Sequence, residues 1–524
     1  MLLLAADTAA GPEVVRAIGI VLAAGLAATA MVGRTSAARA WAMLGALALT
    51  PVLLVLSIWE TPQLATVRDH PLPALAGGAL AAALVVGPLA VLFSRRLAFL
   101  PLAALATLPF RVPVEAGGST ANLLVPLYLV IAAGALAWAV PRARDSEAFD
   151  PPRENGAMEW LLAGAVLLYA LQAAYSTSLD KALEQIVFFY VPFALLFSVL
   201  RDVEWSPRRL QAGFAVLVGL ALIFAGIGFV EYATRTLLLN PKVIASNELE
   251  EYFRVNSLFF DPNIYGRFLA LVMLGLAGVL LWERRPRTVG LATAALVVLW
   301  GGLVLTLSQS SFASLLAGLF VLAALRFPLQ KVLPVGVAAV AVALIVVLAF
   351  PSALRLDLGN TKSIYDATSG RYELMRGGVE LAGDRPLWGW GSGSFPEEYL
   401  AHGFGARSEA VSASHTISLT VAAEQGLIGL AVYLALLAAA LARLLRGARN
   451  DPYRALVAAG FVAVVVHTWM YAAFLEDPVT WTLLAVGAVL ARRPRSRRAA
   501  SEVPLGAEPP RLDPEPLHPL PGGA

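Results

Sequence analysis

The sequence predicts an all-α protein: a polytopic transmembrane helical bundle of about 12–15 spans, with a large extracytoplasmic loop that contains short helices. Apolar residues fill 58% of the 524 positions and charged residues only 14%, against about 45–50% and ~25% in soluble globular chains. Stretches of about 20 apolar residues, the length that crosses the hydrocarbon core as a helix, recur along nearly the whole chain. We therefore expect one membrane domain, residues 1–491.

Fifteen apolar segments are candidate spans. They cover residues 14–33, 40–58, 72–93, 97–110, 121–140, 159–175, 183–200, 209–231, 264–282, 288–306, 310–326, 331–350, 416–442, 455–474 and 478–491. The first of them is predicted to remain as a helix, because no separate signal peptide precedes it. The chain has no cysteine, which excludes disulfides and thiol chemistry.

Basic residues predict the orientation, because lysine and arginine are retained on the cytoplasmic side. The segment after the last span is rich in arginine, so we place it in the cytoplasm, and alternating backwards puts 25 of the 39 basic residues on that side. We therefore predict a multi-pass protein of the inner, cytoplasmic membrane, with the N-terminus outside and the C-terminus in the cytoplasm. The tail, residues 492–524, is basic and then rich in proline, and is predicted to be disordered.

Polar residues concentrate in two segments on the predicted outer side, residues 232–263 and 351–415. In the first, Asp261-Pro262-Asn263 predicts a turn and the start of a helix. Arg254 and Arg267 flank this turn. Arg254 is either a ligand-binding cation or a solvated charge paired with Glu250 or Glu251. Arg267 is either part of the same site or an anchor at the lipid interface.

The second loop is predicted to contain a helix that starts at Arg371, after Ser369-Gly370, and stops at residues 383–386. Arg371 and Arg376 are five residues apart and need not share a face, so one can point to a site while the other faces solvent. Gly391 and Gly393 follow in a glycine-rich turn, which can bring backbone N–H groups close to an anion. A tight turn without a ligand is the alternative.

His415, one of five histidines, closes this loop at the start of the next span. A helix N-terminus there is expected to keep the imidazole neutral and able to accept a proton; a polar helix cap is the alternative. Glu424 lies inside that span and must face protein or water, because a charge at that depth is costly. We expect it to support the site or the fold. The polar cluster at residues 308–311 either serves a site or lets helices pack closely.

The sequence contains no phosphate-binding loop, dinucleotide fingerprint, HExxH motif or metal-type aspartate pair, so we expect no metal and no cofactor. A net charge of +3 is too small to indicate a nucleic-acid partner. A transporter would be expected to bury charges at mid-membrane around broken helices. Here the distinctive charges lie in outer loops, which favours chemistry at the membrane surface, with a transporter or solute-binding protein as the alternative.

The order and spacing of these segments resemble the O-antigen ligase and O-antigen polymerase family of bacterial membrane glycosyltransferases. The resemblance covers roughly residues 160–490. It rests on residues 254–263, 305–311, 370–374, 385–395, 415 and 423–429. Many relatives have an arginine where this chain has Gln309.

The resemblance implies an enzyme of cell-envelope polysaccharide biosynthesis, O-antigen ligase-like or polymerase-like. Its donor would be a glycan linked to a polyprenyl diphosphate such as undecaprenyl diphosphate, and its acceptor a glycan, lipid or protein outside the cytoplasmic membrane. Transfer would invert the anomeric carbon without a metal. On matching positions, Arg254 and Arg371 would hold the diphosphate and His415 would be the base. Asn263, Gly391 and Gly393 would also bind donor, and Glu424 would support them.

Overall fold

The computed structural model describes residues 10–57, 68–116, 119–145, 154–239, 243–244, 247, 253–349, 371–404 and 413–492. Residues 1–491 form one compact unit and residues 492–524 a second one, and only the first is treated below. The predicted disordered tail lies outside the described residues, apart from residue 492.

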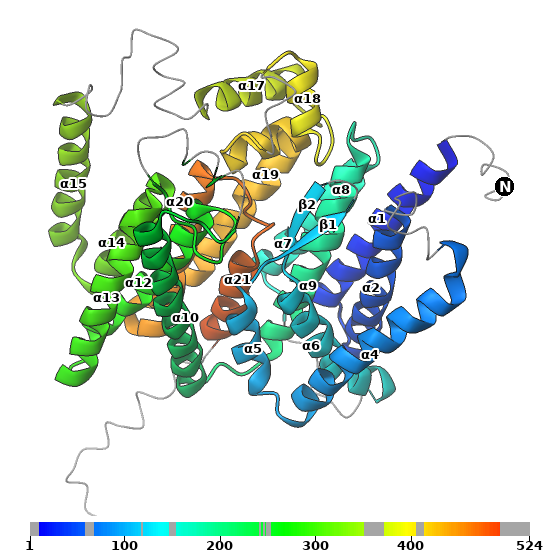
Figure 1. Ribbon diagram of the computed structural model, residues 1–524, viewed down its shortest axis with the longest axis horizontal. Helices are drawn as coiled ribbons and strands as arrows, with labels where there is room; N and C mark the ends of the chain where they lie inside the picture. Colours follow the sequence, from blue (N-terminus) through cyan, green and yellow to red (C-terminus); the bar gives the residue numbers. More distant parts are fainter. Residues whose placement is uncertain are drawn as a thin grey trace, which may run out of the picture. The chain divides into compact units, whose positions relative to one another are not determined.

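The first unit is a helical bundle, as the sequence predicts (Figure 1). Its long helices are α1 (Ala10–Val32), α2 (Ser36–Ser57), α4 (Pro71–Arg95), α6 (Val125–Arg144), α7 (Ala157–Ala173), α9 (Val191–Asp202), α10 (Pro207–Thr234), α12 (Pro262–Trp282), α13 (Pro286–Thr306), α14 (Gln309–Arg326), α15 (Leu329–Ala349), α19 (Ile417–Leu445), α20 (Pro452–Met470) and α21 (Pro478–Ala491). Within the described residues, 11 helical segments are long and apolar enough to cross a membrane, and three shorter apolar helices accompany them. The predicted multi-pass fold is confirmed.

The predicted fourth span, residues 97–110, is wrong as a full crossing. Its helix α5 (Phe99–Thr107) has nine residues, a length of about 14 Å, which is less than half of a ~30 Å hydrocarbon core. An antiparallel hairpin of β1 (Val112–Ala116) and β2 (Ser119–Leu123) follows, with Val112 opposite Leu123. β-Branched residues beyond Pro109 favour strand over helix here, and the hairpin leads directly into α6.

The predicted span 183–200 is the middle of a longer helical segment. α8 (Leu179–Gln185) continues through a π-helical turn, η2 (Ile186–Tyr190), into α9. A π-helical turn inserts an extra residue per turn and is invisible to a 3.6-residue period.

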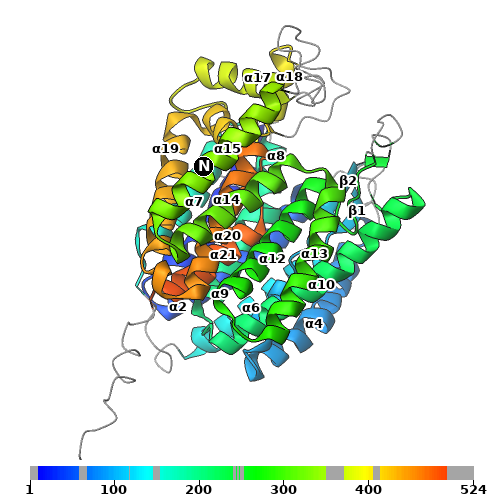
Figure 2. The same cartoon turned by 90° about the vertical axis from the view of Figure 1, so that its left-hand side faces the viewer.

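The helices form two groups around two hydrophobic cores. α1, α2, α6, α7 and α9 pack together, and so do α10, α12, α13, α14 and α20. Figures 1 and 2 show both groups in two views that differ by a 90° rotation. α19 packs against α7 and α20, and α21 packs against α9 and α20, so these two late helices join the groups.

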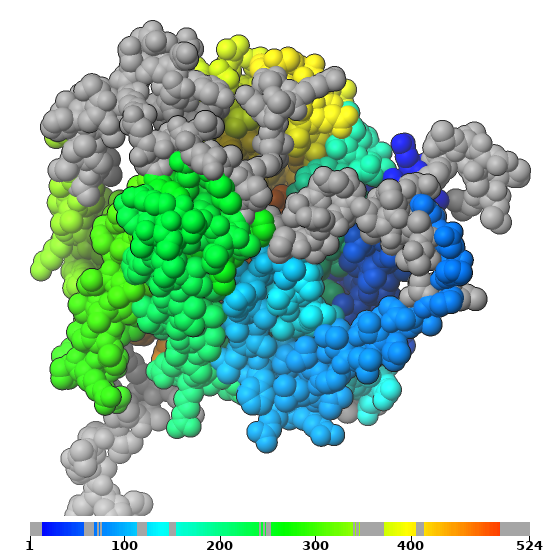
Figure 3. Space-filling view, viewed as in Figure 1, coloured from blue at the N-terminus to red at the C-terminus, as the bar shows by residue number. Residues whose placement is uncertain are grey.

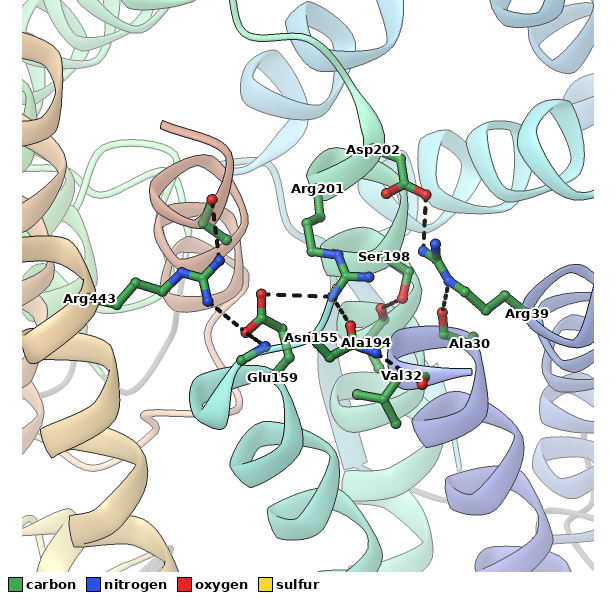
Figure 4. Close-up of polar contacts among 12 residues, drawn as sticks. Ala30, Val32, Arg39, Asn155, Glu159, Ala194, Ser198, Arg201, Asp202 and Arg443 are labelled. Atoms are coloured by element: carbon green, nitrogen blue, oxygen red, sulfur yellow. Dashed lines mark hydrogen bonds and ion pairs between the residues drawn. The ribbon is translucent and has the colours of Figure 1, made fainter. Parts of the chain in front are cut away.

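A buried charge layer ties helices together at one end of the bundle (Figure 4). The Glu159 carboxylate, fully buried on α7, lies 2.9 Å from Arg443 of α19 and 3.8 Å from Arg201 of α9. Arg39 of α2 pairs with Asp202 of α9 at 3.0 Å. All five residues lie in or beside segments predicted to be cytoplasmic. The grouping therefore agrees with the predicted alternation of the spans.

The opposite end carries the short helices predicted in the large loop, α17 (Arg371–Asp384) and α18 (Phe395–Ala401) (Figure 1). The predicted helix at Arg371 is confirmed, and it ends at Asp384, within the predicted stop at residues 383–386. Its predicted start signal, Ser369-Gly370, lies outside the described residues. We call this end of the bundle the α17 end.

Candidate functional site

The start of α12 forms the floor of the site. Asp261 caps this helix: one carboxylate oxygen accepts a hydrogen bond of 2.6 Å from the Asn263 N–H. The other oxygen accepts one of 3.1 Å from the hydroxyl of Tyr471. The predicted helix start at Asp261-Pro262-Asn263 is thus confirmed, because proline fits the first helical position and aspartate satisfies a free N–H. It also fixes the carboxylate at the α17 end.

Arg254 is held beside this floor by neutral acceptors. Its guanidinium donates to the Thr306 carbonyl at 3.0 Å and to the Asn263 side-chain oxygen at 3.4 Å. The backbone N–H of Arg254 donates to the side-chain oxygen of Asn247 at 3.0 Å, which fixes the backbone at Arg254. No described carboxylate lies within ion-pair distance, and Glu250 and Glu251 lie outside the described residues. A cation positioned by neutral groups keeps its charge available for an anion.

Asn263 forms hydrogen bonds with several residues of the protein through its side chain and its backbone. It is 8% exposed, and its side-chain oxygen also accepts a hydrogen bond of 2.8 Å from Ser308. Its carbonyl accepts one of 3.2 Å from Ser311. The side-chain oxygen of Asn263 is thus used by Arg254 and Ser308, and only its amide NH2 group can donate to a bound anion, so its role in donor binding stays a prediction. The serine cluster at residues 308–311 is part of this network, whereas Gln309 itself is exposed.

Arg371 opens α17 and is half-buried above the same floor. Burial lowers the pKa of Arg371 and the charge of Arg254 lowers it further, whereas Asp261 and Tyr471 raise it. Two arginines that are 117 positions apart in the sequence are therefore close enough to repel each other. Among the described residues, no carboxylate pairs with Arg371. Arg376, in contrast, is exposed and pairs with Glu380 at 2.9 Å.

His415 completes this group. Its imidazole ring centre lies 6.0 Å from that of Tyr471. Burial lowers the pKa of His415 and the charge of Arg371 lowers it further, while Asp261 raises it. These effects favour the neutral imidazole that the sequence predicts, and burial, not the helix end, is the largest of them. Its φ of +56° is in the left-handed region, a strained backbone state that is found at functional sites.

The glycine-rich turn binds the carboxylate of Glu424, a residue of the protein itself. The Gly393 N–H donates to the Glu424 carboxylate at 3.0 Å and the Phe395 N–H to its other oxygen at 3.2 Å. The Gly391 N–H donates to the Glu424 backbone carbonyl at 2.8 Å. The prediction that Gly391 and Gly393 bind a diphosphate is therefore wrong, because their N–H groups are already used. Glu424 supports the fold of the loop, as expected.

The same turn fills a break in α19. Gly426 has φ +65° and ψ −167°, which is not helical, and the Leu427 N–H donates to the Pro386 carbonyl at 2.7 Å. Gln172 of α7 donates to the carbonyls of Trp388, at 3.3 Å, and Gln425, at 3.1 Å. The free backbone groups of the broken helix are thus satisfied by the loop that connects α17 to α18.

Sequence reasoning missed a second histidine and an ion pair beneath the site. His467 of α20 is fully buried, and its ring nitrogen lies 3.2 Å from the Asn263 carbonyl. Arg267 and Asp477 are buried and form an ion pair, so the interpretation of Arg267 as an interfacial anchor is wrong. A signal was present: Asp477-Pro478 repeats the Asp-Pro start of α12.

The site has a surplus of positive charge. Burial and Asp261 raise the pKa of Tyr471 well above 10, whereas Arg267 and then Arg111, at the entrance to the β hairpin, lower it. The pKa of Arg371 responds to both Arg254 and Asp261, so two arginines and one carboxylate lie close together. Within the described ranges no group of three or more His, Asp and Glu residues is arranged to hold a metal ion. The arrangement favours an anion with several oxygens, next to a neutral proton acceptor.

Comparison with known families supports this interpretation. The family model described as O-antigen ligase matches residues 294–434, which include Arg371, the glycine-rich turn, His415 and Glu424. The resemblance is confirmed over this part of the chain, and Arg254 and Asn263 lie outside it. No curated protein matches the chain.

Proposed function

Because residues 294–434 carry an O-antigen ligase domain, we propose that the protein transfers a polyprenyl-diphosphate-linked glycan to an acceptor hydroxyl during envelope polysaccharide assembly. The domain itself supports glycan transfer in polysaccharide assembly. The donor, the acceptor class and the chemistry are our proposal. The observation that carries it is the convergence of Arg254 and Arg371 with His415 around Asp261 and Tyr471.

In this proposal the diphosphate binds between Arg254 and Arg371. Guanidinium groups donate forked, charge-assisted hydrogen bonds that match phosphate oxygens. Negative charge grows on the diphosphate as the bond to the sugar breaks, so the two arginines stabilise the transition state more than the bound donor. Their mutual repulsion in the empty site, which lowers the pKa of Arg371, is relieved when the dianion binds.

His415 then acts as the general base. The acceptor oxygen forms a bond to the anomeric carbon while the bond from that carbon to the diphosphate oxygen breaks. The hydroxyl proton moves to the neutral imidazole, and the polyprenyl diphosphate leaves with both electrons of the broken bond. A single displacement of this kind inverts the anomeric carbon. Asp261, whose charge raises the pKa of His415, favours the imidazolium as it forms.

The proposed location is the inner membrane, with the α17 end outside and the buried charge layer on the cytoplasmic side. This orientation rests on the arginine distribution. It places the site where lipid-linked glycans are consumed outside the cytoplasm. The tail from residue 492 then lies in the cytoplasm.

A transporter of the same architecture is the alternative, and the break in α19, in the part of the chain that the structure describes, is a feature that favours it. In the described residues this break is filled by the protein's own loop, and Glu424 at its edge accepts three backbone hydrogen bonds, two of them through its carboxylate. In a substrate pathway, the backbone groups at the break and the Glu424 carboxylate would be accessible to a ligand. The arrangement therefore favours surface chemistry.

The test is complementation of a deletion strain, read as an envelope-glycan profile, with membrane abundance checked by immunoblot. Arg371→Ala should lose ~10²–10³ in rate, as expected for a positioned donor to a developing charge. Arg371→Lys should also be impaired, because an ammonium lacks the fork. His415→Ala should lose ~10²–10⁴. Arg376→Ala is the matched control on α17 and should transfer normally. Full transfer by inserted Arg371→Ala and His415→Ala proteins would refute the mechanism.

The pH profile separates a base from a structural histidine. His415 must be neutral to accept a proton, and its pKa is lowered from 6.5, so transfer should persist until the pH falls below that value. Arg371→Gln removes a cation that lowers this pKa, so the acid limb of its residual activity should move to higher pH. Arg371→Lys keeps the charge and should leave the limb in place. Identical limbs in both variants would exclude His415 as the base.

A further inference from the structure

A second, unrelated feature lies between the helices on the membrane-facing side. A cavity of about 650 Å³ opens between α5, α10, α12, α20 and α21. α5 and α10 lie side by side on the face shown in Figure 3. Its interior is lined by apolar side chains, among them Leu105, Phe214, Leu271, Leu456 and Leu483. An apolar cavity of this size among transmembrane helices is suited to hydrocarbon.

The charged lining residues of the cavity gather at one end. Its polar and charged lining there includes Gln211, Glu283, Arg285 and Thr288, which lie at the ends of α10 and α12 and the start of α13. Gln211 donates to the hydroxyl of Tyr453, another lining residue, at 2.9 Å. These residues adjoin the segments predicted to be cytoplasmic. The polar mouth therefore lies at the end of the bundle opposite the α17 end.

Arg285 is one of several cations at this mouth. The Glu283 carboxylate next to it accepts the backbone N–H groups of Arg284 and Arg285 at 2.8 and 3.0 Å, and among the described residues no carboxylate lies within ion-pair distance of the Arg285 guanidinium. Arg284 lies beside it, and Arg287 is the second residue of α13. Three arginines against one carboxylate give the mouth a net positive charge, which attracts an anion.

The length of the cavity matches a hydrocarbon chain. Along α12 its lining runs from Phe268 to Trp282, a rise of about 21 Å along the helix. One leaflet of a ~30 Å hydrocarbon core is about 15 Å deep. A chain that enters from the mouth can thus be enclosed along the full depth of its own leaflet.

We propose that this groove binds one acyl chain of an anionic phospholipid, with the lipid phosphate beside Arg285. By the predicted orientation the lipid comes from the cytoplasmic leaflet. Apolar contact along the groove supplies affinity for the chain, and the arginines select a negatively charged headgroup. The site is at the opposite end of the helices from Arg254 and His415, so it does not depend on the proposed glycan transfer.

A groove-filling variant tests the chain. Gly460 of α20 lines the groove, and a Cβ added there would meet only ordinary contacts, the nearest being Leu483 at 3.5 Å. Gly460→Phe should therefore fill the groove without a clash at its base. The matched control is Gly219→Phe on α10, where an added Cβ meets nothing within 4 Å and the position is exposed.

The measurement is native mass spectrometry of the purified full chain titrated with dipalmitoyl phosphatidylglycerol or dipalmitoyl phosphatidylcholine. The wild type and Gly219→Phe should retain phosphatidylglycerol preferentially, and Gly460→Phe should lose at least tenfold in its retention. Arg285→Gln, an exposed change that leaves the groove intact, should reduce the preference for phosphatidylglycerol about fivefold.

Three results would overturn the proposal. One is equal retention of the two lipids by the wild type, and another is an unchanged preference in Arg285→Gln. The third is a co-purified isoprenoid phosphate that phosphatidylglycerol cannot displace, since the groove would then hold a different lipid. If Gly460→Phe does not fold, the Arg285→Gln result decides alone, because it reports the headgroup directly. Loss of glycan transfer in the site variants would leave all of these results unchanged.

Discussion

Glu159→Gln is the sharpest test of the buried charge layer. The carboxylate is fully buried and faces two arginines, Arg443 at 2.9 Å and Arg201 at 3.8 Å, and it accepts the Gly156 N–H at 3.0 Å. The amide keeps the shape and can still accept that hydrogen bond, but it leaves two cations without their shared anion. Removing one partner of a buried ion pair costs about 3–5 kcal/mol, so we expect a loss of that size in the free energy of unfolding.

Substitution of the arginine partner should lower the free energy of unfolding by less. Arg443→Met leaves Glu159 with Arg201, and the Arg443 side chain is already 19% exposed, so we expect a loss of about 1.5–3 kcal/mol, the value of a hydrogen bond to a charged group. The double variant Glu159→Gln with Arg443→Met should cost less than the sum, by roughly 0.5–3 kcal/mol. The exposed pair of Glu204 with Arg209, 3.8 Å apart, provides the control, and Glu204→Gln should change stability by less than about 1 kcal/mol.

The assay is reversible unfolding in detergent by added sodium dodecyl sulfate, followed by circular dichroism. It reads stability without any need for activity, and the layer lies away from the proposed site. If Glu159→Gln falls within about 0.5 kcal/mol of the wild type, as surface changes do, the layer does not stabilise the bundle. Additive single variants would show that the two side chains do not interact.

Two further predictions concern topology and the glycine turn. Single cysteines introduced by Ser363→Cys and Ser501→Cys into this cysteine-free chain should differ in their labelling by a membrane-impermeant thiol reagent in intact cells. Only the cysteine at position 363 should be labelled. Labelling of position 501 alone would mean that the orientation is the reverse of the predicted one. Gly391→Ala should lower stability by roughly 2–6 kcal/mol, because φ is +99° and the new Cβ would lie 2.3 Å from the backbone of Ser176. Gly403→Ala, with φ +78° and nothing within 4 Å, should cost only about 1–2 kcal/mol in melting experiments, and equal effects would contradict the packing argument.

The membrane fold could be predicted because its signal is repeated. Each span is a long apolar run, and each helix start at Asp261-Pro262 or at Arg371 has local residues that specify it. The α5 helix could not be separated from a short span, because both are apolar and only length distinguishes them. The hairpin at residues 112–123 lies mostly between two predicted spans and carries no strong strand pattern. The π-helical turn at residues 186–190 leaves no mark in composition.

The candidate site could be predicted from the sequence only in part. Arg254, Arg371 and His415 are polar residues in the loops predicted to lie outside, and their types alone suggest their chemistry. The partners of a hydrogen bond are not local in sequence, however. The Gly393 N–H is used by Glu424, 31 positions away, so a sequence that favours anion binding says nothing about which anion is bound. Tyr471 and His467 were missed because an aromatic or a single histidine in an apolar helix is usually core.

The way the glycine turn is seated also has a consequence for building hybrid proteins. The turn lies inside the segment that matches the O-antigen ligase family, residues 294–434, but much of its seat is on and just after α7. There Tyr175 donates to the Trp388 carbonyl at 2.6 Å, and Ser176 donates to the Ser392 carbonyl at 2.8 Å. A transplant of the matched segment from a relative would therefore part the turn from its seat. Exchanges should be designed to move residues 169–182 together with that segment, so that the donor's turn arrives with the surface that shapes it.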